Sequence, residues 1–278
     1  MDLPEFRRTY QRILDEVKVA VVGQDRVIEL LLTCVMAEGH AILTGVPGLG
    51  RTLIAETLGR VLGLNVRRIQ FTPDLLPTDV TGTDVIDFKE GRFSHRFVPG
   101  PVFANLVLAD EINRSPARTQ AALLEAMQEK QVTANGRQHT LERPFLVVAT
   151  QNTLDTEGVY PLPEAQLDRF LMQIEMRYPG EDAEVEILDA TTSVYSGTVD
   201  RVTDPATVVA MQQFGSAGRK AAAAGRRTDS LSTACRRRTR SRPAACSYRS
   251  SSSRRTIRPP DRSIRPARGP ARDLRARS

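Results

Sequence analysis

The sequence has no apolar run that approaches the roughly 18 residues needed to span a bilayer. Its amino-terminal stretch, MDLPEFRRTYQRILDEV, mixes charges and lacks the apolar centre of a secretion signal. Cysteines are few: Cys34 lies in an apolar helical stretch, and Cys235 and Cys246 have no His or Cys at ligand spacing. These absences argue against membrane insertion, a disulfide framework and a zinc site. A cytoplasmic location is the default expectation.

The carboxyl-terminal segment lacks the residues that build a core. From Arg219 to Ser278 there are 18 Arg and 1 Lys against 3 Asp, with no Val, Phe or Met. The segment therefore carries +16, which leaves −10 on residues 1–218 and gives the +6 of the whole chain. We expect this tail to be disordered. Nucleic-acid binding is disfavoured because Tyr248 is its single aromatic residue and forms no stacking platform.

A glycine-rich stretch, AILTGVPGLGRT, runs from Ala41 to Thr52 and is followed by the apolar-rich LIAETLGRVL. The order predicts a strand, a tight loop and a helix. The consensus of phosphate-binding loops, G-x-x-x-x-G-K-[ST], is met at Gly45, Gly50 and Thr52, but Arg51 stands in place of the lysine. The competing interpretation is a glycine-rich turn between an ordinary strand and helix.

Each residue type in this loop suits phosphate chemistry. Glycines let backbone N–H groups approach phosphate oxygens, and the following helix directs its positive end at them. The hydroxyl of Thr52 would then be a Mg²⁺ ligand. Arg51 keeps the positive charge of the missing lysine, but its planar guanidinium is bulkier. We expect this replacement to affect hydrolysis more than binding.

Two adjacent carboxylates, Asp110 and Glu111, end the aliphatic run NLVLADE about 60 residues after the loop. Such a run fits a strand buried on both faces of a parallel sheet, and ligands bind at the carboxyl edge of such sheets. In a phosphate-loop protein Asp110 would hold Mg²⁺, and Glu111 would orient and deprotonate the attacking water.

A second buried strand, FLVVAT from Phe145 to Thr150, ends at Gln151 and Asn152. A polar amide at that tip could hydrogen-bond the terminal phosphate or the attacking water; the alternative is an ordinary strand-ending turn. Arg169 near the end of a predicted helix could sense a phosphate in a neighbouring subunit, or pair with a surface carboxylate.

The remaining pattern alternates helices and strands. His40, at a helix-to-strand junction, is interpreted as structural. Asp25 is placed to cap the second helix. Hairpins are expected around Lys89-Glu90-Gly91 and on Asn135-Gly136. Other predicted elements are helices at 4–18, 25–37, 116–130, 162–170 and 179–190, a helix that ends near 62, and strands at 66–71 and 171–174.

Several blocks together resemble the AAA+ ATPases, and more narrowly the MoxR family, over about residues 5–212. They are GVPGLGRT, FTPDLLPTDVTGTDV, VPGPVFANLVLADEINR, QAALLEAMQE, VVATQN and YPLPEAQLDRF. The resemblance implies an α/β fold, with a P-loop NTPase core in which helices flank a parallel sheet. We expect this core at 1–178, the start of a helical lid at 179–215 and a basic tail at 216–278.

The resemblance also implies roles for individual residues, with ATP and Mg²⁺ as cofactors. Asp110 and Glu111 match the Walker B pair, Asn152 the sensor 1 position and Arg169 the arginine finger. Gly23 and Gln24 match a segment that lies near the adenine. The Walker A loop and the start of its helix comprise Gly45, Val46, Pro47, Gly48, Leu49, Gly50, Arg51, Thr52 and Leu53.

Proteins of this family form rings, usually hexamers, and resemble chaperones that remodel client complexes beside proteins with a von Willebrand factor A domain. Two alternatives stay open: a nucleotide-binding assembly module with little hydrolysis, and a metal-chelatase motor subunit. The family's lid arginine, in a Ser-Pro-Arg-Ala-like context, has no match here. Our hypothesis for the divergent tail is a reading-frame slip between Phe214 and Lys220.

Overall fold

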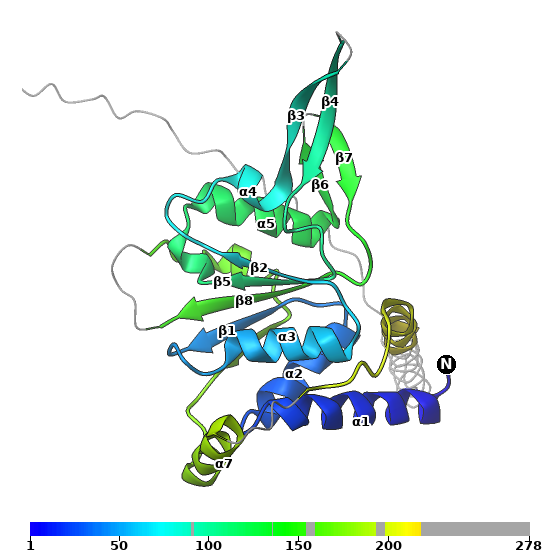
Figure 1. Ribbon diagram of the computed structural model, residues 1–278, viewed down its shortest axis with the longest axis vertical. Helices are drawn as coiled ribbons and strands as arrows, with labels where there is room; N and C mark the ends of the chain where they lie inside the picture. The colour runs from blue at the N-terminus through cyan, green and yellow to red at the C-terminus, as the bar shows by residue number, and fades with distance from the viewer. Residues whose placement is uncertain (90–91, 135, 154–158, 193–197, 218–278) are drawn as a thin grey trace, which may run out of the picture. The chain divides into compact units, whose positions relative to one another are not determined.

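Five parallel strands form the central sheet, in the spatial order β2-β5-β8-β1-β9 (Figure 1). The computed structural model describes residues 1–89, 92–134, 136–153, 159–192 and 198–217. All of them belong to one unit, Met1–Thr228. The strands are β1 (Ala41–Gly45), β2 (Val66–Gln70), β5 (Leu106–Asp110), β8 (Leu146–Asn152) and β9 (Met172–Glu175). The predicted parallel α/β fold is confirmed.

The aliphatic runs are buried because helices cover both faces of the sheet. Leu43, Leu108 and Val148 face one side, where they pack against the first three helices. Ile42 and Val107 face the other side, where they pack against α4 and α5. The helices are α1 (Leu3–Ala20), α2 (Asp25–Met36), α3 (Arg51–Val61), α4 (Pro77–Thr81) and α5 (Ala117–Glu129).

Two antiparallel hairpins project from the α5 side of the sheet (Figure 1). Both were predicted, although the turn residues 90–91 and 135 lie outside the described residues. The rings of Phe97 and His139, one from each hairpin, stack with centroids 3.8 Å apart. The strands are β3 (Gly82–Lys89) with β4 (Arg92–Pro99), and β6 (Gln131–Ala134) with β7 (Arg137–Thr140).

Two local predictions were wrong. Asp25 does not cap α2: the N-cap residue is Gln24, and the Asp25 carboxylate pairs with the Lys18 ammonium at 2.5 Å. The helix predicted at 162–170 is a single turn, α6 (Glu164–Leu167), because Pro163 starts it late and the chain then turns toward β9. A short 3₁₀ helix, η1 (Ile112–Arg114), follows β5.

The predicted lid region contains α7 (Glu181–Thr192) and a further helix at 205–217. The latter packs back on the amino-terminal helices: Val208 and Met211 are fully buried. The Gln212 amide donates to the carbonyl of Val35 at 2.7 Å, and the Phe214 ring lies 5.5 Å from that of Phe6. The boundary at 178 stays a prediction, and the tail from 218 onward lies outside the described residues.

His40 joins three elements at the edge of the sheet where β1 and β8 begin. The Val147 amide donates to its Nδ1 at 3.0 Å, and the Lys130 ammonium lies 3.0 Å from its Nε2. Burial, and then the Lys130 charge, lowers the pKa of His40 to about 3. The histidine is therefore neutral in the folded protein, which supports the structural interpretation.

The described residues include no helix with the length and apolar character of a membrane span. Cys34 is buried and free, and burial raises the pKa of its thiol to about 11. Cys235 and Cys246 lie outside the described residues.

We predict that Met211→Ala lowers the unfolding free energy by about 2–5 kcal/mol, because it empties a fully buried site between helices. Urea unfolding at neutral pH measures the change. Gln213→Ala, at an exposed position of the same helix, serves as the control and is expected to leave the midpoint in place. Equal midpoints for both variants would mean that the helix contributes nothing to the core.

We also predict an acid-dependent loss of stability through His40. Because its folded pKa is depressed below the unfolded value, this contribution is complete above about pH 6.5 and is lost as pH falls toward 3. From pH 8 to pH 5 the loss is about 2 kcal/mol. Urea unfolding across this range should give a shallower pH slope for His40→Gln than for the exposed control His95→Gln. Parallel slopes would contradict the prediction.

Candidate functional site

The glycine-rich loop connects β1 to α3 and presents its backbone to open space. Gly48 and Gly50 have φ values of +88° and +76°, which favour glycine, and a Cβ added at either would meet no atom of the described residues within 4 Å. Gly45 is constrained differently, because a Cβ there would lie 2.7 Å from the carbonyl oxygen of Met176. The loop thus leaves an accessible, amide-lined mouth at the amino end of α3, where anions bind favourably.

Arg51, at the start of α3, turns back on the loop. Its Nη2 donates to the carbonyls of Gly45 and of Val46, the latter at 2.6 Å. The residue is 9% exposed, and its buried Nε has no hydrogen-bond partner among the residues that the structure describes. Burial lowers the pKa of the guanidinium, and the nearby Asp110 and Glu111 carboxylates oppose that effect.

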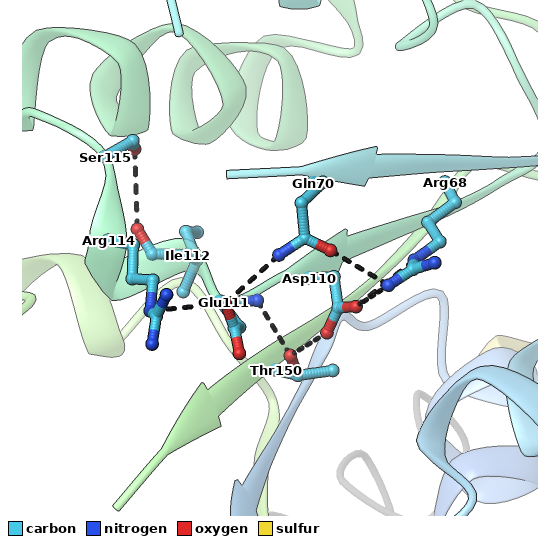
Figure 2. Close-up of polar contacts among 8 residues, drawn as sticks. All are labelled: Arg68, Gln70, Asp110, Glu111, Ile112, Arg114, Ser115 and Thr150. Atoms are coloured by element: carbon cyan, nitrogen blue, oxygen red, sulfur yellow. Dashed lines mark hydrogen bonds and ion pairs between the residues drawn. The ribbon is translucent and has the colours of Figure 1, made fainter. Parts of the chain in front are cut away.

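Asp110 ends β5 and uses both carboxylate oxygens in the structure (Figure 2). Its Oδ1 accepts from the Thr150 hydroxyl of β8 at 2.6 Å. Its Oδ2 accepts from Nε and Nη2 of Arg68 of β2, at 3.1 and 2.5 Å. Both neighbouring strands therefore fix the carboxylate at the carboxyl edge of the sheet, where the sequence predicts it.

Glu111 has a left-handed backbone, with φ 56° and ψ 49°, which is uncommon for residues with a side chain. Its amide donates to Thr150 Oγ1 at 2.9 Å, which fixes this conformation. The carboxylate accepts from the Gln70 amide at 3.1 Å and pairs with Arg114 Nε at 3.2 Å (Figure 2). Unusual backbone geometry held by surrounding contacts is typical of functional sites.

Asn152 lies directly across from Gly45 in the β1–β8 register. It is therefore part of β8 rather than of a turn after it, and the structure brings it beside the first residue of the loop. Thr52 follows Arg51 in the first turn of α3 and is half-buried. Pro47 and Leu49 complete the loop; Pro47 is exposed and Leu49 is buried.

A mainly apolar cavity of about 300 Å³ opens next to the loop. One wall is Gly48–Gly50 with Leu53 and Ile54 of α3, and another is formed at the end of α1 and just after it by Ala20, Val21, Val22 and Gln24. Tyr178 and Pro179, with Glu184 and Ile187 of α7, complete it. Its volume lies at the lower end of those of small-ligand pockets.

Gln24 lines this cavity and joins two segments distant in sequence. Its amide donates to the carbonyl of Arg177 at 3.0 Å. Gly23, with φ +75°, packs so closely that an added Cβ would lie 2.9 Å from the Cβ of Pro179. Both predicted residues therefore lie at the junction between the amino-terminal segment and the chain leading to α7, although Gly23 itself does not line the cavity.

Arg169 is not brought to this site. It is exposed and lies just before β9, whose first residue, Met172, pairs with Ala41 at the amino end of β1. The loop and Asn152 lie at the opposite, carboxyl end of the same strands. Within the described ranges, no side-chain hydrogen bond or ion pair is found for Arg169.

Four residues that contact the carboxylates were not identified from the sequence: Arg68, Gln70, Arg114 and Thr150. Arg68 and Gln70 have the two-residue spacing of one strand face, which the alternating pattern of β2 indicates. That β2 and β8 both flank β5 follows from the strand order. No local signal in the sequence specifies that order.

The site offers few protein oxygen ligands, which suits a metal ion that binds together with a nucleotide. No group of three or more His, Cys, Asp or Glu side chains able to hold an ion occurs in the part of the chain that the structure describes. Mg²⁺ at nucleotide sites needs only one or two protein ligands, because phosphates and waters supply the rest. The Thr52 hydroxyl and the Asp110 carboxylate offer the oxygen chemistry that this requires, and their role as ligands stays a prediction.

Comparisons with known proteins agree with this geometry. The model of the ATPase family associated with various cellular activities (AAA) matches residues 40–172. Chaperone MoxR1 of Mycobacterium tuberculosis is 52% identical over 180 residues, covering 65% of this chain and 47% of the relative. Protein MoxR of Methylorubrum extorquens is 36% identical over 182 residues, covering 64% and 52%.

A solved structure from Cytophaga hutchinsonii, of a protein assigned as an ATPase, superposes with a TM-score of 0.68 at 44% identity. The superposition covers 75% of this chain and 63% of that one. The chain spans about half the length of the curated relatives it matches. Its loop, sheet order and sequence are similar to those of these proteins, and this agreement supports a MoxR-type AAA+ ATPase.

Proposed function

We propose that the chain binds ATP with Mg²⁺ at the carboxyl edge of the sheet and hydrolyses it. The observation that carries this proposal is the continuity of the open loop at Gly48–Gly50 with the apolar cavity beside it. A planar base fits an apolar cavity, and the phosphates of the same molecule would then reach the amide-lined loop. The carboxylates Asp110 and Glu111 lie close enough to act electrostatically on Arg51 of that loop.

The roles follow from position. Loop amides and Arg51 would bind the phosphates, and the cavity beside Gln24 would hold the base. Thr52 and Asp110 would hold Mg²⁺, which neutralises developing charge on the phosphates. Glu111 would accept a proton from the attacking water, and Asn152, adjacent to Gly45, would orient the water or the terminal phosphate.

We extend the proposal to a ring, with a hexamer as the expected size. The position of Arg169 supports this, because it lies at the edge of the sheet opposite its own site. An arginine there would act on ATP in a neighbouring copy, and such a head-to-tail interface gives a ring when the rotation between copies closes. The work of the ring would be chaperone-like remodelling of a client complex, with a von Willebrand factor A domain protein as partner.

A second candidate function is a nucleotide-dependent assembly module with little hydrolysis. The observation that favours it is the engagement of Arg51 by the Gly45 and Val46 carbonyls. A guanidinium held in this way has fewer N–H groups to follow a phosphate through the transition state than a free lysine ammonium has. Binding would then survive while turnover falls.

We predict that Glu111→Gln keeps ATP binding and lowers Mg²⁺-dependent turnover about 100- to 10,000-fold, because the amide cannot accept the proton of water. Calorimetry measures binding, and phosphate release measures turnover. Glu125→Gln, at an exposed position of α5, is the matched control and should retain the parent rate. If Glu111→Gln turns over at the parent rate, Glu111 is not the base.

We predict that Arg51→Lys raises turnover about tenfold while ATP affinity changes little. A tenfold change in rate corresponds to about the free energy of one hydrogen bond to a charged group. Arg60→Lys, at an exposed position near the end of α3, tests for unspecific effects of the same exchange. If the parent chain hydrolyses ATP and Arg51→Lys has the same rate, the guanidinium is tolerated and the assembly-module alternative loses its support.

A further inference from the structure

We propose that Arg68 is a positioning residue that competes with Mg²⁺ for Asp110, so that metal loading requires its guanidinium to leave the carboxylate. This inference rests on the proposed function, because the metal is expected to arrive with ATP. It adds to that function a residue of β2 that sets how much Mg²⁺ the site needs.

The hydrogen-bond inventory of Asp110 supports the competition. A carboxylate has about four lone-pair sites. The Thr150 hydroxyl occupies one on Oδ1, and Arg68 Nε and Nη2 occupy two on Oδ2. The Asp110 side chain is only 14% exposed, so few directions of approach remain. The one remaining site lies on Oδ1 beside the Thr150 hydroxyl, so a cation that uses more of this carboxylate must displace Arg68 from Oδ2.

The positive charge of Arg68 also weakens the binding of Mg²⁺ to Asp110. Arg68 neutralises Asp110 at 2.5 Å, so the carboxylate attracts a second cation less than a free one would. The guanidinium would also repel a divalent ion bound to the same group. Removal of the Arg68 charge should therefore favour the metal even where the carboxylate does not move.

Arg68 has an alternative position available. Its side chain is 49% exposed, and Nη2 also donates to Gln70 Oε1 at 2.9 Å (Figure 2). It can leave Asp110 for solvent while it keeps the Gln70 contact. Because the Arg68 end of the pair is half-exposed, water can replace its contacts when a metal displaces it.

Arg67 offers a matched control one residue away. Successive residues of a strand point to opposite faces, so Arg67 points away from the face that carries Arg68 and Gln70. It is exposed, and the contacts of Asp110 in the structure come from Arg68 and Thr150. Arg67→Gln removes the same unit of charge from the same strand without removing a contact to Asp110.

The experiment titrates Mg²⁺ into the full chain at fixed ATP and follows ATP binding by calorimetry, without reference to turnover. We expect Arg68→Gln to lower the Mg²⁺ concentration for half-maximal enhancement of binding about two- to fivefold, the range of an exposed ion pair. Binding in EDTA should stay unchanged. Arg67→Gln should match the parent chain, and Arg68→Lys, which keeps the charge but not the two-nitrogen contact, should fall between them.

Thermal melts in EDTA check that each variant is folded. If Arg68→Gln does not fold, Arg68→Lys is the variant that tests the competition. An unchanged or raised Mg²⁺ requirement in a folded Arg68 variant overturns the competition, since Arg68 would then be neutral or supportive. An equal shift in Arg67→Gln also overturns it, because general charge would explain the effect. Absence of ATP binding in every protein, the parent included, would instead overturn the proposed function.

Discussion

Parallel pairing of β5, β8 and β1 is the constraint on which the site depends. Their register places Gly45 across from Asn152 and brings Thr150 within reach of Asp110. The Thr150 hydroxyl then serves both carboxylate residues, because it donates to Asp110 and accepts from the amide of Glu111. Thr150 of the central strand β8 thus fixes the conformation of both residues at the end of β5. Burial of the strands on both faces packs this arrangement tightly.

The three arginines around Asp110 and Glu111 differ in burial and in the side from which they approach. Arg51 lies within the loop and is nearly buried, whereas Arg68 and Arg114 approach from the exposed side. The acidic pair is therefore balanced by charge before any ligand arrives. Such a site is stable in its resting state, but an incoming divalent ion meets groups that are already paired. This differs from a site whose acidic residues are left open for a resident metal.

The sequence was sufficient to predict the elements whose signals are local. Aliphatic runs mark β5 and β8, glycines mark the loop, and Gly136 helps to mark a hairpin turn. Local rules failed where a distant or neighbouring group competed: Asp25 pairs with Lys18 instead of capping α2. The roles of Arg68 and Thr150 could not be predicted, because they depend on the order of strands in the sheet, which is a property of the whole fold.

The helix at 205–217 has a consequence for how the protein is made. Its Gln212 contacts Val35 across 177 positions of sequence, so the face of α2 that it covers is synthesised long before its partner. At the speed of a ribosome this interval lasts roughly 10 to 35 s. During that time the apolar face of the amino-terminal helices lacks this cover. A nascent chain of this protein therefore exposes an apolar face for that interval, and transiently exposed apolar surface favours aggregation.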